Sequence, residues 1–248
     1  MTSKERVAAA MNLRPVDRVP LMCQMSIGHM LLQLKVSPAD FWFDPHVFAD
    51  GLLQLRELYG FDGILISLHG HDPDWRNDVQ SRRLTDEGEL VLWKNGDATL
   101  CLFNDLPRFI PRKAVPAPQF SAFSPDELPQ TLEYIPVSGG LHFTLNAEHT
   151  FDVIVDIVRR AGKEFSIHGE VTSPFDYFLD IFGYQEGLMA MAVDPDKCRK
   201  ILQHFTVLVQ QLAIAMCTTG IDALKVSSPF AGSGFISPGF YATFVLPY

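Results

Sequence analysis

The sequence predicts an α/β fold, and three observations support this prediction. Short apolar runs of strand length alternate with amphipathic stretches of helix length along most of the 248 residues, which is typical of parallel βαβ units. The apolar runs are continuous, as expected for strands that are covered on both faces. No G-x-G-x-x-G motif follows a predicted strand, which favours a barrel of the TIM type over a nucleotide-binding, doubly wound sheet.

The first part of the chain predicts two helices and two buried strands. Thr2 or Ser3 caps a short helix at the N-terminus. The apolar runs at about 18–24 and 61–70 predict the two strands. Between them, the apolar spacing in "PHVFADGLLQLRELYG" predicts a helix that ends at Gly60.

The middle of the chain interrupts this alternation. In "ELVLWKNGDATLCLF", two apolar runs flank Asn95-Gly96, which is a strong signal for a tight hairpin turn. We therefore expect a β-hairpin insertion near 85–105. Residues 106–140 are rich in proline and predict a long irregular excursion.

The alternation resumes after residue 150. Helices are predicted in "TFDVIVDIVRRAG", in "FDYFLDIFGYQEGLMAMAVD" and from Pro195 to Gly220. Strands are predicted at about 164–171 and 222–228, so four strong parallel strands are expected in all. A closed barrel needs eight strands, and the open sheet edges of a half-barrel predict self-association.

Composition excludes several classes of partner. The net charge of −9 argues against nucleic acid and anionic membrane surfaces, which favour basic proteins. No apolar run approaches the roughly 18 residues of a membrane span, and the N-terminus lacks a secretory apolar core, so we expect a cytoplasmic protein. The four cysteines form no C-x-x-C pair and are expected to be buried thiols.

Several segments in order carry a family resemblance. They are "KERVAAAMNLRPVDRVPL", "YGFDGILIS", "GEVTSPFDYFLDIFGYQEGL", "VDPDKCRKILQHFTVLVQQLAIAMCTTGIDALKV" and "ISPGFYATFVLPY". Together they resemble the uroporphyrinogen decarboxylase superfamily, which includes corrinoid- and coenzyme M-linked methyltransferases. The resemblance implies a (β/α)8 TIM barrel with its site at the C-terminal ends of the strands. Residues 1–248 would be one incomplete domain with the first four or five βα units, and roughly the last third of the family's length would be absent.

The catalytic pattern of the decarboxylase itself does not carry over. Its arginine-bearing "M-R-Q-A-G-R" motif corresponds here to "MCQMSIGHML", in which Gln24 matches but no arginine occurs. Its aspartate at the end of the second strand corresponds to His69, and its "F-D-S" corresponds to Val226-Ser227-Ser228. Uroporphyrinogen decarboxylation, a lyase reaction of tetrapyrrole biosynthesis, is therefore the alternative rather than the leading hypothesis.

The methyltransferase branch implies a zinc ion that activates a substrate thiol. In that branch a His-x-Cys pair and a later cysteine hold the metal, and all three would lie beyond Tyr248. We therefore assign no metal ligand within the chain. The resemblance also implies a corrinoid carried by a partner protein.

The cluster "LHGHDPDW" follows the second predicted strand, at the end where sites of parallel α/β proteins form. We expect His69 to be catalytic and His71 and Asp72 to bind substrate. On an extended chain the two histidines point the same way and could bind a metal or an anion, with Asp72 orienting an imidazole. A solvated loop with an Asp-Pro turn is the other interpretation.

The stretch "SIHGEVTSPFDY" repeats this pattern on the third predicted strand. His168 and Glu170 share a face and are expected to be catalytic, with Glu170 as acid or base. Asp176 and Tyr177 are expected to bind substrate. In the other interpretation, His168 is a hydrogen-bonded core residue and Asp176 a helix cap.

Four further residues complete the predicted pocket. Gln24 and His29 follow the first predicted strand, and Ser228 follows the fourth, so all three are expected to bind substrate. Lys225 could be a nucleophile with a depressed pKa, but a lysine in such a position more often pairs with a carboxylate or reaches solvent.

Three functional hypotheses follow from the sequence. The leading one is a methyltransferase that acts on a small methylated substrate together with a corrinoid protein. The second is uroporphyrinogen decarboxylation. The third is a chain without catalytic activity that binds a ligand or a partner.

Overall fold

The computed structural model describes residues 1–114, 116–138 and 140–248, and residue contacts divide the chain into two compact units. The first unit comprises Met1–Ala114, Thr144–Gly169 and Met216–Leu224. The second comprises Val115–Phe143, Glu170–Ala215 and Lys225–Tyr248. The expectation of one barrel domain over residues 1–248 stays a prediction.

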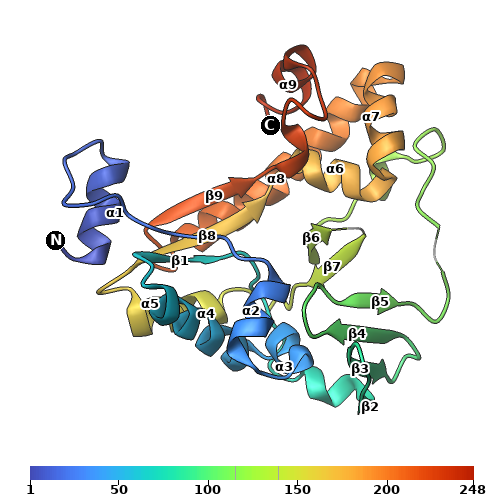
Figure 1. The fold of residues 1–248 in the computed structure, drawn as a ribbon. Helices are drawn as coiled ribbons and strands as arrows, with labels where there is room; N and C mark the ends of the chain where they lie inside the picture. The colour runs from blue at the N-terminus through green and yellow to red at the C-terminus, as the bar shows by residue number, and fades with distance from the viewer. Residues whose placement is uncertain (115, 139) are drawn as a thin grey trace. The chain divides into compact units, whose positions relative to one another are not determined.

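A parallel sheet of three described strands has the order β1-β8-β9 (Figure 1). Gly63 to Ile66 of β1 lie opposite Ser166 to Gly169 of β8 in parallel register. The sheet confirms the predicted α/β class. Its strands are β1 (Gly63–Ile66), β8 (Ser166–Thr172) and β9 (Ala223–Ser227).

The prediction of a strand at 18–24 is wrong. This segment has no regular structure, and the side chains of Val19 and Leu21 are 76% and 54% exposed, so it is not a buried run. Pro20 has no N–H to donate. Leu21 is nevertheless fixed beside β1, because its carbonyl accepts the Asp62 N–H (2.7 Å) and its own N–H donates to the Asp62 carboxylate (2.9 Å).

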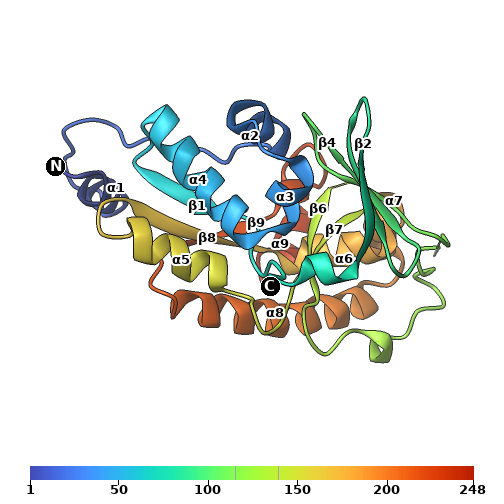
Figure 2. The same ribbon diagram turned by 90° about the horizontal axis from the view of Figure 1, so that it is seen from below.

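Helices α4 and α5 pack against each other and lie along one side of β1 in the first unit (Figures 1 and 2). Leu55 of α4, Ile157 of α5 and Ile66 of β1 are fully buried there. Gly60 ends α4 in the left-handed conformation (φ +65°), as predicted. The helices of this unit are α1 (Ser3–Met11), α2 (Ile27–Leu34), α3 (Pro38–Phe43), α4 (Pro45–Tyr59), the 3₁₀ helix η1 (Trp75–Asp78) and α5 (Asp152–Ala161).

The predicted hairpin is confirmed and forms part of an antiparallel sheet in the order β2-β3-β4-β5. Its turn closes with a hydrogen bond from the Trp93 N–H to the Asp97 carbonyl (2.9 Å), and Gly96 has the positive φ (+92°) that the turn requires. Val91 and Cys101 are fully buried in a cluster with Ala39 of α3. The strands are β2 (Val79–Leu84), β3 (Gly88–Trp93), β4 (Ala98–Leu102) and β5 (Arg108–Ile110).

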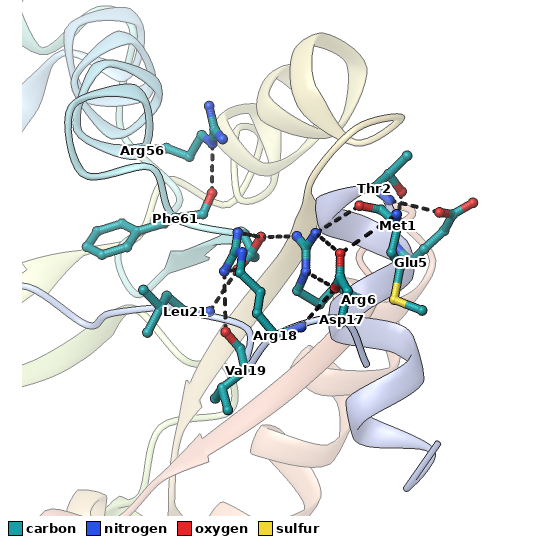
Figure 3. Close-up of polar contacts among 11 residues, drawn as sticks. Met1, Thr2, Glu5, Arg6, Asp17, Arg18, Val19, Leu21, Arg56 and Phe61 are labelled. Atoms are coloured by element: carbon teal, nitrogen blue, oxygen red, sulfur yellow. Dashed lines mark hydrogen bonds and ion pairs between the residues drawn. The ribbon is translucent and has the colours of Figure 1, made fainter. Parts of the chain in front are cut away.

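A charged network stands at the amino end of β1 (Figure 3). The fully buried Asp62 accepts hydrogen bonds from Arg6 (2.7 Å) and from two nitrogens of Arg18 (both 2.7 Å). Arg6 also donates to both oxygens of Asp17, at 2.6 and 2.8 Å. The network ties α1 and the segment before Leu21 to the start of the parallel sheet.

The second unit is mostly helical. Gly183, with φ +78°, divides the predicted helix after β8 into two. The Asp194 carboxylate accepts the Lys197 N–H (3.0 Å) and caps the long helix that follows, as its Asp-Pro start predicts. Within the proline-rich excursion, strands β6 and β7 pair with each other. The elements are the 3₁₀ helix η2 (Pro125–Glu127), β6 (Tyr134–Ser138), β7 (Leu141–Thr144), α6 (Pro174–Phe182), α7 (Tyr184–Val193), α8 (Pro195–Cys217), the 3₁₀ helix η3 (Pro229–Ala231) and α9 (Pro238–Phe244).

Candidate functional site

Some of the predicted site residues form two groups, one in each unit. In the first unit, the imidazole pair His69 and His71 follows β1. In the second unit, a strand-end cluster stands at the carboxyl ends of β8 and β9 and in the loops that follow them. Its members are Glu170, Asp176, Lys225 and Ser228, together with Ser173, which the sequence did not predict as a site residue.

The imidazole pair is closed off from solvent, with His69 0% and His71 2% exposed. The Nδ1 of His69 lies 3.0 Å from the Thr150 carbonyl, and because a carbonyl only accepts, this nitrogen carries the proton. His71 packs on Phe48 with ring centroids 4.7 Å apart. The expectation that the chain is extended here is wrong, since Gly70 between the two histidines has φ +78°.

Burial decides the charge of both rings. It lowers the pKa of His69 to about 4, against the opposing effect of the Thr150 carbonyl. Burial and the neighbouring His69 lower the pKa of His71 to about 3, while Asp44 opposes them. Both imidazoles are therefore neutral at pH 7, and the catalytic role predicted for His69 stays a prediction.

Asp72 builds the turn after the imidazole pair. Its Oδ1 accepts the Asp74 N–H at 2.8 Å, and its carbonyl accepts the Trp75 N–H at 3.3 Å. This geometry favours the interpretation of an Asp-Pro turn for this residue.

In the strand-end cluster, Lys225 of β9 donates to Oε2 of Glu170 on β8 at 3.2 Å. Glu170 is buried (8% exposed), whereas Lys225 is half-buried. The contact supports the interpretation in which Lys225 pairs with a carboxylate. A buried carboxylate beside a lysine at the end of two parallel strands is a suitable acid–base group.

Ser173, Asp176 and Ser228 form the second part of this cluster. The Ser173 hydroxyl donates to Oδ2 of Asp176 (2.5 Å) and accepts the Asp176 N–H (3.1 Å), so Ser173 is the cap of α6. The suggestion that Asp176 is the cap is therefore wrong. The Ser173 and Ser228 hydroxyl oxygens lie 2.9 Å apart, which connects β8, α6 and the end of β9.

Burial raises the pKa of the Asp176 carboxyl, and the hydrogen bond from Ser173 opposes this shift. Asp176 thus keeps its proton to a higher pH than an exposed aspartate does. Ser173 was not among the predicted site residues. The signal that could have identified it is the Ser-Pro dipeptide at the start of the helix, since serine is a preferred cap and proline a preferred first residue.

Besides Asp72, four predicted residues lie outside both groups. Gln24 is exposed and donates to the Ser67 hydroxyl at 3.5 Å, and His29 is exposed and lies 2.7 Å from the Tyr59 hydroxyl. His168 is half-buried, with Nε2 2.9 Å from the Ser166 hydroxyl, and burial lowers its pKa against the effect of Asp222. The fourth is Tyr177, which is 2% exposed and donates to the Tyr134 carbonyl at 2.9 Å.

Residues 129–248 match the family model described as uroporphyrinogen decarboxylase. The whole chain is also 24% identical over 253 residues to the methylcobamide:CoM methyltransferase MtbA of Methanosarcina mazei. Residues 129–248 thus resemble the uroporphyrinogen decarboxylase family, and the chain as a whole is similar to a methyltransferase. This finding confirms the resemblance that the sequence motifs indicated.

A solved structure has a similar fold. A methyltransferase from Methanosarcina mazei matches 99% of the chain with a TM-score of 0.62 at 18% identity. The chain spans 64% of the length of this structure and 64% of the length of MtbA. In the described residues, no helix is long and apolar enough to cross a membrane.

Proposed function

We propose that the chain is a methyltransferase-type enzyme of the superfamily, which moves a methyl group between a small methylated compound or thiol and a corrinoid carried by a partner protein. The observation that carries the proposal is the similarity to a methylcobamide:CoM methyltransferase, which extends over 100% of the chain. The absence of a membrane-spanning helix from the described residues is compatible with the proposed cytoplasmic location.

The proposed fold is a TIM barrel with the first βα units supplied by this chain. The parallel order β1-β8-β9 and the likeness to a methyltransferase structure support it. Leu21 supports it too, because the segment around Leu21 pairs with Asp62 at the edge of β1, where a further strand of a barrel would lie. The hairpin sheet is then an insertion between the strands of the barrel.

We assign Glu170 as the acid–base group of the site and Lys225 as the residue that positions it. The ammonium of Lys225 holds one carboxylate oxygen, at 3.2 Å, and thereby restricts the rotamer of Glu170. Ser228 is half-buried at the end of β9 and supplies a hydroxyl for the substrate. The Ser173 hydroxyl, which contacts Asp176, lies 2.9 Å from the Ser228 hydroxyl and restricts its orientation.

Zinc does not fit the described residues. Among them, no three histidine, cysteine, aspartate or glutamate side chains converge on a point where a metal could bind. We therefore derive no step through zinc for this chain. The expectation that the ligands lie beyond residue 248 stays a prediction.

Uroporphyrinogen decarboxylation is the second candidate, because the family model that matches residues 129–248 bears that description. Its substrate carries eight carboxylates and requires cations for binding. The strand-end cluster has two carboxyl groups, Glu170 and Asp176, and one cation, Lys225, which is already paired. The charge of this cluster therefore favours the methyltransferase.

The two functions can be separated with the purified 248-residue chain. Under anaerobic conditions, methylcobalamin and coenzyme M are mixed with the chain, and demethylation of the corrinoid is followed by visible absorbance. We expect a rate above the protein-free background that falls at least about tenfold in Glu170→Gln. The exposed Glu57→Gln of α4 is the matched control and should keep the full rate.

The other outcomes are equally informative. Release of carbon dioxide from uroporphyrinogen without methyl transfer would establish the decarboxylase instead. If the folded chain catalyses neither reaction, the hypothesis of a non-catalytic binding protein gains.

A further inference from the structure

The second unit contains a recess of about 220 Å³ that is separate from the strand-end cluster. The proline-rich excursion lines one part of it, and helices α6 and α8 line the rest. Its volume is below the roughly 300–1,000 Å³ of drug-sized sites, so it suits a ligand of few heavy atoms. The residues that define its chemistry are Phe123, Tyr134, Tyr177, Phe205, Glu127 and Glu133.

Aromatic side chains form much of the wall and are held in fixed orientations. Tyr177 stacks on Phe205 with ring centroids 5.2 Å apart and planes 10° apart. Tyr134 stacks on His142 with centroids 3.9 Å apart. Rings that are already fixed lose little entropy when a ligand binds, which favours recognition.

The hydroxyls of the two tyrosines already have acceptors. Tyr134 donates to the Asp180 carboxylate at 2.9 Å, and Tyr177 donates to the Tyr134 carbonyl at 2.9 Å. The tyrosines therefore offer rings and no further hydroxyl proton to a ligand. An anionic ligand would gain little from them.

The charged groups in the wall are both negative. Glu127 and Glu133 line the recess, and the residues that line it include no lysine, arginine or histidine. Aromatic rings attract cations through their negative faces, and nearby carboxylates add to this attraction. Shape and charge together favour a small cation with apolar substituents.

The excursion that carries Phe123 and the glutamates is hydrogen-bonded to helices α7 and α8. Glu186 of α7 accepts the Phe120 N–H at 2.7 Å, and Lys197 of α8 donates to the Phe120 carbonyl at 2.5 Å. Further along, His204 Nε2 of α8 donates to the Pro129 carbonyl at 2.7 Å. These bonds hold the wall in place without a ligand.

We propose that this recess, lined by Phe123, Tyr134, Tyr177, Phe205, Glu127 and Glu133, binds a small quaternary or tertiary ammonium compound. Methyl groups on nitrogen contact the rings, and the carboxylates balance the charge. The site is distinct from the strand-end cluster and does not depend on the function proposed for that cluster.

The test uses the full chain and two probes of nearly equal shape. Choline carries the charge, and 3,3-dimethylbutan-1-ol replaces its nitrogen by carbon. Isothermal titration calorimetry should show saturable binding of choline with a dissociation constant at least about tenfold lower than that of the neutral alcohol. Equal binding of the two probes, or no saturable binding of choline, would overturn the proposal.

Variants of residues that line the recess test whether choline binds there. Phe123→Leu, which removes a ring and keeps an apolar side chain, and Glu133→Gln, which removes an exposed charge, should each weaken choline binding at least about threefold. Glu148→Gln changes an exposed carboxylate of the first unit and serves as the control for net charge. Choline binding that is unchanged in both Phe123→Leu and Glu133→Gln would place the ligand elsewhere and refute the assignment.

Discussion

Asp62 and Asp222 make the same pair of hydrogen bonds with the chain segment beside them. The Asp62 N–H donates to the Leu21 carbonyl and its carboxylate accepts the Leu21 N–H, at 2.7 and 2.9 Å. The Asp222 N–H donates to the Ile167 carbonyl and its carboxylate accepts the Ile167 N–H, at 2.7 and 3.0 Å. Each aspartate thus fixes the register of a strand against its neighbour, so the two βα units are built alike.

The two aspartates differ in their surroundings, which predicts different effects of mutation. Asp62 is fully buried between Arg6 and Arg18, whereas the Asp222 side chain is 26% exposed and pairs with Lys4 at 2.8 Å. We expect Asp62→Asn to lower the free energy of unfolding by about 3 kcal/mol, because it leaves the buried guanidinium of Arg6 without this carboxylate partner. Asp222→Asn should lower it by less than about 1 kcal/mol. Urea unfolding of both variants measures the difference, and equal effects would contradict the assignment.

Acid titration gives an independent check on Asp62. Burial raises its pKa, but hydrogen bonds from Leu21, Arg18 and Arg6 outweigh burial and lower it to about 2. A carboxylate with a lowered pKa stabilises the folded state above its unfolded pKa of about 4, and this stability is lost as the pH falls towards 2. In Asp62→Asn, the loss of stability over this window should be smaller than in the wild type.

The imidazole pair predicts a second pH window. Both histidines have pKa values lowered by burial, to about 4 for His69 and about 3 for His71. The unfolded chain takes up protons on these residues below about pH 6.5, while the folded chain does not. Stability is therefore complete above about pH 6.5 and falls as the pH drops towards 4, by on the order of 3 kcal/mol for His69 alone.

His69→Asn tests this window. The asparagine Nδ2 can replace the bond from His69 Nδ1 to the Thr150 carbonyl, but it does not titrate. Chemical unfolding between pH 7 and 4.5 should show a shallower pH dependence for this variant. The exposed His46→Asn is the control, and an effect as large as that of His69→Asn would argue against burial as the cause.

Ser173 is predicted to stabilise the folded chain in two ways, as the cap of α6 and as a hydrogen-bond donor to Asp176. Ser173→Ala removes the cap of α6 and also the hydrogen bond to the buried Asp176 carboxyl, so the free energy of unfolding should fall by about 2 kcal/mol. Ser237→Ala removes only the exposed cap of α9, whose bond to the Phe240 N–H is 3.3 Å, and should cost about 0.5 kcal/mol. Denaturant midpoints measure both. If the two losses were equal, the Asp176 bond would contribute nothing.

Glu170 and Lys225 are predicted to act as one unit in methyl transfer. Glu170→Gln and Lys225→Met should each reduce kcat at least about tenfold, and the double variant should be no slower than the slower single variant. Additive losses in the double variant would show that Lys225 has no positioning role.

Local signals predicted much of the fold because the responsible interactions are local. Asn95-Gly96 predicted its hairpin, since a turn with positive φ needs glycine. Gly60 and Asp194 marked helix ends that the structure confirms. The sequence also repeats an aspartate before a strand, in "GFDGILIS" and "GIDALKVS". The role of this aspartate was not predictable, because it depends on hydrogen bonds to segments far away in sequence.

The candidate site was predictable only in part. The positions of Glu170, Asp176 and Ser228 after buried strands indicated polar groups at one end of a sheet, and Ser173 now connects two of them. Tyr177 was expected in the same pocket, but its side chain lines a different recess. The direction of a helical side chain depends on how the helix is rotated about its axis, and spacing alone left that rotation open for α6.

The sequence by itself determined the α/β class, the hairpin and most helix ends, because these depend on local periodicity, caps and turns. Only the tertiary structure decided that residues 18–24 form no strand, that His69 and His71 are buried and neutral, and that Lys225 pairs with Glu170. Each of these depends on burial or on a partner distant in sequence. The free energy of burying a charged or polar group depends on how much solvent still reaches it in the folded chain and on which partners it contacts there.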